Sequence, residues 1–290
     1  MSCSQEYMGP TAHRAKRLGR NNGRYQGETI EIGQVVENCG QIGAANGWSQ
    51  EWISAGPGVQ ILALSRVAPL APLGSVPRRR RVYLSAGIHG DEPAGPRALE
   101  EMLERDCWPR DLDLWVIPCL NPGGFVKGTR ENPDGLDLNR QYRNPLAAET
   151  KAHLDWLGRQ PHFDLCLALH EDWESSGFYL YELNPDGQPS LAETMLQAAA
   201  ACCPIDSAEK IEALPAHGGI IRPVVNPEKR LDWPEALFLV GSQKTHLSYT
   251  LEGPSDFPLA TRIAALTAAT LAGLEVFCKR PFEADQDGPG

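Results

Sequence analysis

A histidine and a glutamate three positions apart are the first residues in this sequence that could do chemistry. His89 and Glu92 stand just after an apolar run, where a helical pattern begins. Imidazole nitrogen and carboxylate oxygen are zinc ligands, and a catalytic zinc site keeps one position open for water. His170, which follows another apolar run, is the candidate for the third ligand. Together these three residues would make the open metal site of a zinc hydrolase.

H-x-x-E alone is a weak motif, because strand-end histidines and a glutamate favoured by a helix dipole give the same pattern. The turn-rich loop 128–140 adds Arg130, Asn139 and Arg140. Arginine offers a planar fork to a carboxylate, and a fixed cation stabilises negative charge that develops in a transition state. We therefore expect a carboxylate-binding or charge-stabilising role for this loop, with an ordinary solvated loop as the alternative.

The elements that must position these residues alternate between strand and helix patterns. Strands are predicted at 59–64, 82–88, 112–118, 163–169, 178–181, 219–225, 236–239 and 246–251, and helices at 92–105, 147–157, 190–201 and 259–277. Residues 29–58 show no clear period. The alternation predicts an α/β fold with a mixed, largely parallel twisted sheet flanked by helices on both faces, in a single domain. Functional groups gather at the carboxyl ends of such strands, where His89 and His170 both stand.

Composition narrows the class of protein. The chain has 290 residues and a net charge of −10, which argues against a general nucleic-acid binder. We predict a flexible lead-in at residues 1–28 and a catalytic domain at 29–290. No secretory signal and no membrane-spanning apolar stretch are apparent, and the eight cysteines form no C-x-x-C pair. We therefore expect a cytoplasmic protein without a membrane partner, while the oligomeric state is not predicted.

The chain resembles a known family over about residues 82–252. Five separated elements occur in the order found in zinc metallocarboxypeptidases similar to carboxypeptidase A: His89-x-x-Glu92, Arg130, Asp137-Leu138-Asn139-Arg140, His170 and Thr250-Leu251-Glu252. Five elements in order are far more specific than any one of them. The resemblance implies the zinc-carboxypeptidase fold.

The same resemblance implies roles for the matching residues. One zinc ion would be held by His89, Glu92 and His170, and Glu252 would be the general base that takes a proton from the metal-bound water. Arg130 would polarise the scissile carbonyl. The substrate's terminal carboxylate would be held by Asn139 and Arg140. The implied activity is hydrolysis of a peptide or peptide-like amide bond next to a free carboxylate.

Some features depart from the family or leave alternatives. Carboxypeptidase A-like enzymes place a substrate-covering tyrosine shortly before the catalytic glutamate, but residues 226–248 contain none, and Trp233 is given no role. Glu171 and Asp172 are rival bases, although we expect them around the ligands or at the rim of the cleft. Tyr179 and Tyr181 are expected to pack on a strand, with one of them lining the cleft as the alternative.

Two other functions remain open. An N-acyl amino acid deacylase, similar to succinylglutamate desuccinylase and aspartoacylase, would share the H-x-x-E motif, the Asn-Arg pair and the later histidine. Those enzymes usually carry a β-rich domain after the catalytic glutamate, whereas 38 residues follow Glu252 here. This difference favours the peptidase branch or a bacterial murein-peptide amidase and leaves the deacylase open, so the expected substrate is a peptide or an acyl-amino acid. The second alternative is a non-catalytic binding protein on the same fold.

Overall fold

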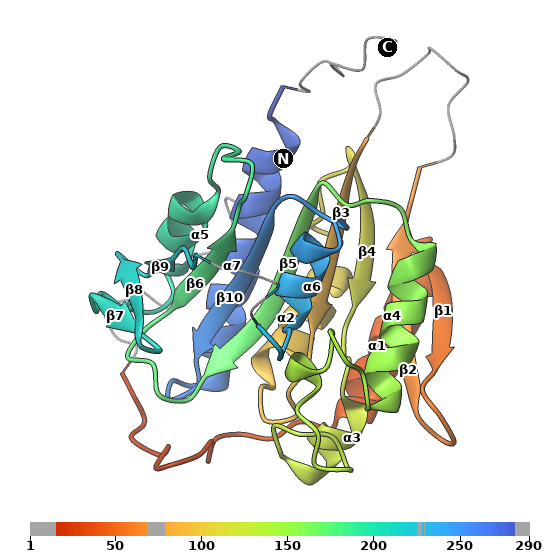
Figure 1. The fold of residues 1–290 in the computed structure, drawn as a ribbon, viewed down its shortest axis with the longest axis horizontal. Helices are drawn as coiled ribbons and strands as arrows, with labels where there is room; N and C mark the ends of the chain where they lie inside the picture. Colours follow the sequence, from red (N-terminus) through yellow and green to blue (C-terminus); the bar gives the residue numbers. More distant parts are fainter. Residues whose placement is uncertain (1–15, 69–78, 225–227, 229, 282–290) are drawn as a thin grey trace.

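The computed structural model describes residues 16–68, 79–224, 228 and 230–281, which fold around a ten-stranded sheet (Figure 1). The order across the sheet is β1-β2-β4-β3-β5-β10-β6-β9-β8-β7. The strands are β1 (Ser49–Ser54), β2 (Gln60–Arg66), β3 (Arg80–Ala86), β4 (Leu112–Ile117), β5 (Leu165–Asp172), β6 (Tyr179–Leu183), β7 (Lys210–Ile211), β8 (Leu214–His217), β9 (Ile220–Ile221) and β10 (Ser248–Pro254).

The centre of the sheet consists of four parallel strands, β4, β3, β5 and β10. On their two sides β2 and β6 pair antiparallel, and β1 continues antiparallel to β2. The predicted mixed α/β fold is confirmed, with a smaller share of parallel pairing than expected. Because the central strands are parallel, their carboxyl ends meet at one edge of the sheet, where groups from β3, β5 and β10 can converge.

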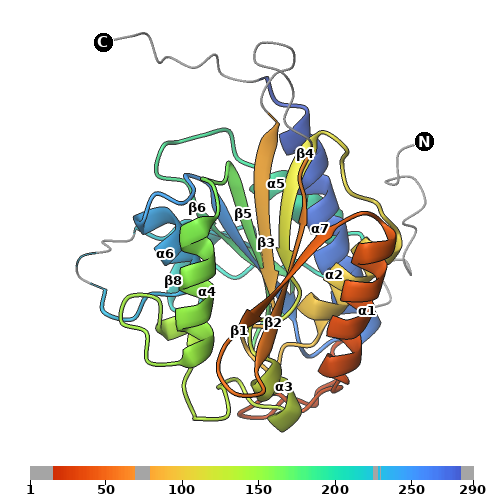
Figure 2. The ribbon, with the colours of Figure 1, turned by 90° about the vertical axis from the view of Figure 1, so that its right-hand side faces the viewer.

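Helices cover both faces of the sheet (Figure 2). One face carries α1 (Ile32–Ala45), α2 (Ala94–Glu104), α5 (Ala192–Ala199) and α7 (Leu259–Cys278), and the other carries α4 (Ala148–Arg159) and α6 (Glu235–Gly241). Strand side chains alternate between the two cores. Val82 and Leu84 of β3 pack in the core beneath α2 and α7, whereas Tyr83 packs with Trp156 of α4.

The structure corrects several predicted elements. Residues 236–239 belong to helix α6, so the predicted strand there is wrong; a short apolar run does not distinguish the two structures. Strand β9 covers only part of the strand predicted at 219–225, and residue 225 lies outside the described residues. Residues 29–58, in which no element was predicted, contain helix α1 and strand β1. The loop 121–145 contains α3 (Pro122–Lys127) and the 3-10 helix η3 (Leu138–Arg140).

Residues 16–31 run along the edge of the sheet toward which β5 and β10 point (Figure 1). We call this segment the strap. Within it, the backbone N–H of Leu18 donates to the carbonyl of Asp256, just beyond β10, at 2.6 Å. Residues 1–15 of the predicted lead-in lie outside the described residues.

Helix α7 is the one described helix that is long and apolar enough to cross a membrane, contrary to the expectation from the sequence. Just over half of its most apolar window, 56%, is buried inside the protein, and α7 packs against α2 and α5. Core helices pass the same test of length and composition, so α7 is weak evidence for a membrane span.

Candidate metal centre and cleft

The three predicted metal ligands converge. The ligand atoms of His89, Glu92 and His170 all lie within 4.8 Å of one another, and all three residues are buried. Each imidazole presents Nδ1 to the Glu92 carboxylate, at 2.5 Å from Oε1 for His89 and 2.9 Å from Oε2 for His170. The three side chains, which come from the ends of two strands and the start of one helix, therefore converge on one site.

Local structure fixes the first two ligands beyond the end of β3. Gly87 adopts a φ of +64°, which glycine tolerates and which turns the chain toward His89. At Gly90 a Cβ atom would lie 2.0 Å from the carbonyl carbon of Gly124 in α3. Only glycine permits this approach, so the His89–Glu92 turn is packed against the loop that carries Arg130.

The donor set fits a zinc ion. Glu92 Oε2 is buried, and no described donor is aligned to hydrogen-bond with it. Burial alone would raise the pKa of Glu92, but the two imidazoles outweigh it and hold the pKa well below its ordinary value. Two imidazoles and one ionised carboxylate are the protein ligands of open catalytic zinc sites.

Asp137 is a residue whose role the sequence analysis missed. Its Oδ1 lies 3.3 Å from Nε2 of His89, on the opposite side of the ring from Glu92, and its Oδ2 accepts a hydrogen bond from Nε of Arg130 at 2.9 Å. A carboxylate behind a metal-binding histidine orients the ring and raises its basicity. In the sequence, the one indication of this role was an acidic residue seven positions after Arg130.

Arg130 extends its guanidinium over the candidate metal centre. Its Nη1 lies 3.3 Å from His89 Nδ1 and 3.8 Å from Glu92 Oε1. Burial acts to lower the pKa of Arg130, but Glu92 and Asp137 outweigh it and raise the pKa above its ordinary value. The group is therefore a fixed cation, and its partly exposed side chain reaches the cleft.

Glu252 stands beside His170, since the two residues are in register on the parallel strands β10 and β5. Its side chain is nine-tenths buried. Burial raises its pKa well above the ordinary value, and the negative charges of Glu92 and Asp172 add to the effect. A carboxyl group thus faces the cleft next to the ligands, at the position predicted for a general base.

Asn139 and Arg140 lie in η3, whose first turn is capped by the Asp137 carboxylate. Asn139 Oδ1 accepts a hydrogen bond from the backbone N–H of Glu235 at 2.9 Å, which leaves its NH₂ group available to a ligand. Nη1 of Arg140 donates to the carbonyl of Asn139 at 2.9 Å. Adjacent amide and guanidinium donors are suited to a carboxylate.

One cleft of about 400 Å³ brings all the predicted site residues together. Its lining includes His89, Glu92, Arg130, Asn139, Arg140, His170 and Glu252. A larger and more apolar hollow of about 680 Å³ lies between α1, β1 and α3 and contains none of them. The polar cleft is therefore where we place the chemistry.

Known proteins resemble this chain in sequence and in fold. Residues 78–214 match the family described as the succinylglutamate desuccinylase/aspartoacylase catalytic domain. Carboxypeptidase SOL1 of Arabidopsis thaliana is 32% identical over 104 residues, and the match covers 29% of this chain and 21% of that protein. The matched segment thus spans about a fifth of the length of this relative.

Solved structures agree over most of the chain. A candidate metallopeptidase from Shewanella amazonensis has a TM-score of 0.69 at 25% identity, covering 85% of this chain and 93% of its own. A metallo-carboxypeptidase from Pseudomonas aeruginosa, in complex with (2-guanidinoethylmercapto)succinic acid, has a TM-score of 0.60 at 20% identity, covering 85% and 68%. The chain therefore shares its fold with these metallopeptidase structures, and residues 78–214 are similar to the succinylglutamate desuccinylase/aspartoacylase catalytic domain.

The tyrosines that line the cleft come from segments other than residues 226–248, where the sequence analysis looked for one. Tyr25 of the strap and Tyr179 and Tyr181 of β6 line the cleft, so the two β6 tyrosines do more than pack on a strand. From the described part of the segment before Glu252, Arg230 and Pro234 reach the lining. The tyrosines that line the cleft therefore come from the strap and from β6.

The two rival bases, Glu171 and Asp172, have other partners. The side chain of Glu171 is fully buried and forms an ion pair with Arg262. Asp172 accepts hydrogen bonds from the Tyr179 hydroxyl and from the backbone N–H of Glu174. Glu252 alone of these three carboxyl groups has no side-chain hydrogen bond to a described residue, which favours it as the base.

Proposed function

We propose that this chain is a zinc-dependent metallocarboxypeptidase that hydrolyses a peptide or peptide-like amide bond next to a free carboxylate. The observation that carries the proposal is the single cleft in which a three-ligand metal site, a buried carboxyl group and an Asn-Arg pair meet. Metal, base and carboxylate anchor are the parts that such a reaction requires.

His89, Glu92 and His170 would hold the ion, with Asp137 orienting His89 from behind. A bound zinc ion would supply Lewis acidity and a positive charge, which lower the pKa of a coordinated water and of the carboxyl group facing it. These roles rest on the geometry above and on the resemblance of the motifs.

The chain's own residues supply the remaining functions. Glu252 takes the proton from the attacking water and returns it to the leaving nitrogen. Arg130 stabilises the negative charge that develops on the carbonyl oxygen, because its guanidinium is already fixed by Asp137. Asn139 and Arg140 hold the substrate's terminal carboxylate and place the amide bond near the base.

A neighbour's ligand supports the carboxylate site. The metallo-carboxypeptidase from Pseudomonas aeruginosa is in complex with a succinic acid derivative, a molecule that carries carboxyl groups. A similar carboxylate is what we propose for the Asn139 and Arg140 pair. An N-blocked dipeptide with a free carboxyl end is thus the simplest test substrate.

The second candidate is hydrolysis of an N-acyl amino acid. The family match to the succinylglutamate desuccinylase/aspartoacylase catalytic domain favours it. Such a substrate also has an amide bond next to a free carboxylate, so the same residues would serve. The two candidates differ in what lies on the acyl side of the amide bond.

Hydrolysis of two substrate sets tests the proposal. The zinc-loaded protein is assayed on N-blocked dipeptides and on acetyl- and succinyl-amino acids, with Glu252→Gln as the inactive control. Turnover of dipeptides that is lost in Glu252→Gln supports the peptidase. Turnover confined to acyl-amino acids would replace it with the deacylase, and bound zinc without turnover in either protein would indicate a binding protein.

A further inference from the structure

One buried carboxylate contacts all three segments that carry the metal centre and the base. Glu171 accepts a hydrogen bond from the backbone N–H of Ala94 and another from the Ser255 hydroxyl at 3.2 Å. Its remaining partner is the Arg262 guanidinium. Both side chains of the Glu171–Arg262 pair are fully buried, at 0% exposure.

Glu171 and its partners Ala94 and Ser255 stand close in sequence to the proposed ligands and base. Glu171 directly follows the ligand His170 on β5, and Ala94 opens α2 two residues after the ligand Glu92. Ser255 comes three residues after Glu252, at the end of β10. The carboxylate therefore fixes the spacing between the segments that present two metal ligands and the base, without touching the ligand atoms.

Arg262 is itself held in place by several groups. Its Nε donates to the carbonyl of Phe257 at 2.9 Å, and its Nη2 donates to Glu28 Oε2 at 2.7 Å. The hydroxyl of Tyr25 lies 3.3 Å from both terminal nitrogens, and the ring of Tyr25 lies 5.6 Å from the guanidinium carbon. Tyr25 and Glu28 both belong to the strap.

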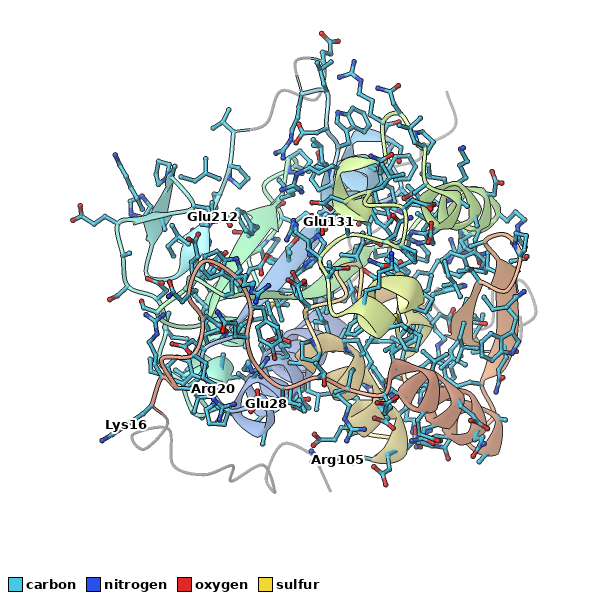
Figure 3. All side chains as sticks on the ribbon, turned by 90° about the horizontal axis from the view of Figure 1, so that it is seen from below. Lys16, Arg20, Glu28, Arg105, Glu131 and Glu212 are labelled. Carbon is cyan, nitrogen blue, oxygen red and sulfur yellow. The ribbon has the colours of Figure 1, made fainter. Side chains whose placement is uncertain are left out.

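The strap is anchored at the same place. The buried carboxylate of Asp256 accepts hydrogen bonds from the backbone N–H groups of Gly19 and Arg20 and from Nε of Arg17, at 3.0 to 3.1 Å. Figure 3 shows Arg20 and Glu28 on the strap as it crosses this end of the molecule. Chain segments far apart in sequence are thus joined beneath the cleft.

A buried ion pair adds little net stability, because the cost of removing two charges from water offsets their attraction. The pair between Glu182 of β6 and Arg222, which follows β9, offers a comparison: Glu182 is buried like Glu171, whereas the side chain of Arg222 is 48% exposed. The difference lies in the partners: Glu182 bonds to Arg222 and to the Tyr249 hydroxyl on β10, whereas Glu171 bonds to Ala94, two residues after the ligand Glu92.

We propose that Glu171 and Arg262 are positioning residues for the metal centre, and that the strap holds Arg262 in place through Tyr25 and Glu28. This inference rests on the proposed function, since it requires the site to bind zinc. The pair keeps the ligand-bearing segments at the spacing that zinc requires, so its loss weakens zinc binding more than it weakens the fold.

The test compares zinc affinity with the stability of the metal-free protein. Zinc dissociation constants are measured by competition with a chromogenic chelator for the wild type, Glu171→Gln and Arg262→Lys, with Glu182→Gln as the matched control. We expect the first two variants to raise the dissociation constant by about tenfold or more, as loss of supporting groups around metal ligands does. The zinc dissociation constant of Glu182→Gln should stay near the wild-type value. This should hold even if the thermal unfolding midpoint of its metal-free form shifts as much as in the other two variants.

Tyr25→Phe removes only the hydroxyl group next to Arg262. If Glu171→Gln and Arg262→Lys do not fold, the zinc affinity of Tyr25→Phe provides the test. It should raise the dissociation constant in the same direction by a smaller factor. Zinc affinity equal to that of the wild type in Glu171→Gln or in Tyr25→Phe, or an equal loss in Glu182→Gln, would overturn the inference. A wild-type protein that binds no zinc would instead overturn the proposed metal centre.

Discussion

The carboxyl group of Glu235 should make the protein less stable as the pH rises from about 5 to 8. Glu235 is the buried first residue of α6, and its carboxylate accepts hydrogen bonds from the hydroxyls of Tyr83 and Ser85, both at 2.8 Å. The nearby His153 ring, 3.9 Å away, provides no charge, because burial lowers its pKa to about 3. Burial accordingly raises the pKa of Glu235 to about 7.

The size of the effect follows from proton linkage. Between the ordinary pKa of 4.5 and the folded value of about 7, the folded state keeps a proton that the unfolded chain has lost. The stabilising contribution is thus complete below pH 4.5 and is lost as the pH rises through 7. Since one pKa unit corresponds to about 1.4 kcal/mol, the free energy of unfolding should fall by about 3 kcal/mol.

Glu235→Gln cannot ionise and should remove this dependence. The free energy of unfolding is measured by urea denaturation at pH 5 and pH 8 for the wild type and the variant. Part of the effect is already lost at pH 5, so the wild type should lose about 2.5 kcal/mol more than the variant between the two pH values, while groups that titrate in both proteins cancel. Parallel pH profiles would refute the reasoning, because they would mean that Glu235 is already ionised at pH 5 in the folded state.

Three further predictions concern the site and its support. Asp137→Asn should weaken zinc binding by about 10- to 100-fold in chelator competition, because His89 loses the charge behind it; unchanged affinity would contradict this role. Arg140→Gln should lower kcat/KM by about 10- to 100-fold for a substrate with a free terminal carboxylate and much less for its amide, and equal losses would reject the carboxylate anchor. Gly90→Ala should destabilise the fold by about 2 kcal/mol or more in thermal denaturation, since the added Cβ would overlap Gly124; an unchanged midpoint would show that the turn can move.

The sequence was sufficient to predict the centre of the fold and the convergence of the ligands. The apolar runs that became β3 and β5 are continuous, as strands buried on both faces are, and each ends at a histidine. Once two parallel strands are assumed, their carboxyl ends must meet, which brings His89 and His170 together. The order of motifs then added Arg130, Asn139 and Glu252, all of which line the cleft.

Elements with weak local signals were missed. Helix α1 contains Gly33, Gly40 and Gly43, which lower helix propensity. The close packing is visible only in three dimensions: a Cβ at Gly43 would come within 3.1 Å of Leu64 in β2. The helical spacing of its buried residues Ile32, Val35 and Cys39 was present in the sequence, but the glycines of the helix weaken that signal.

The residues that support the metal centre could not be predicted from the sequence either. Asp137 acts through its distance to His89, and Glu171 through contacts with residues 77 and 91 positions away. A single sequence gives no means of pairing carboxylates with cations over such separations. The ligands themselves are predictable because they follow strand ends, whereas their supports depend on side-chain packing.

The zinc content of the purified chain tests the central claim most directly. Elemental analysis after equilibration with zinc and removal of excess metal should find one ion per chain in the wild type, and loss of that ion in His170→Ala with the fold retained by circular dichroism. A wild type without bound metal, or a His170→Ala variant that keeps its zinc, would contradict the three-ligand site.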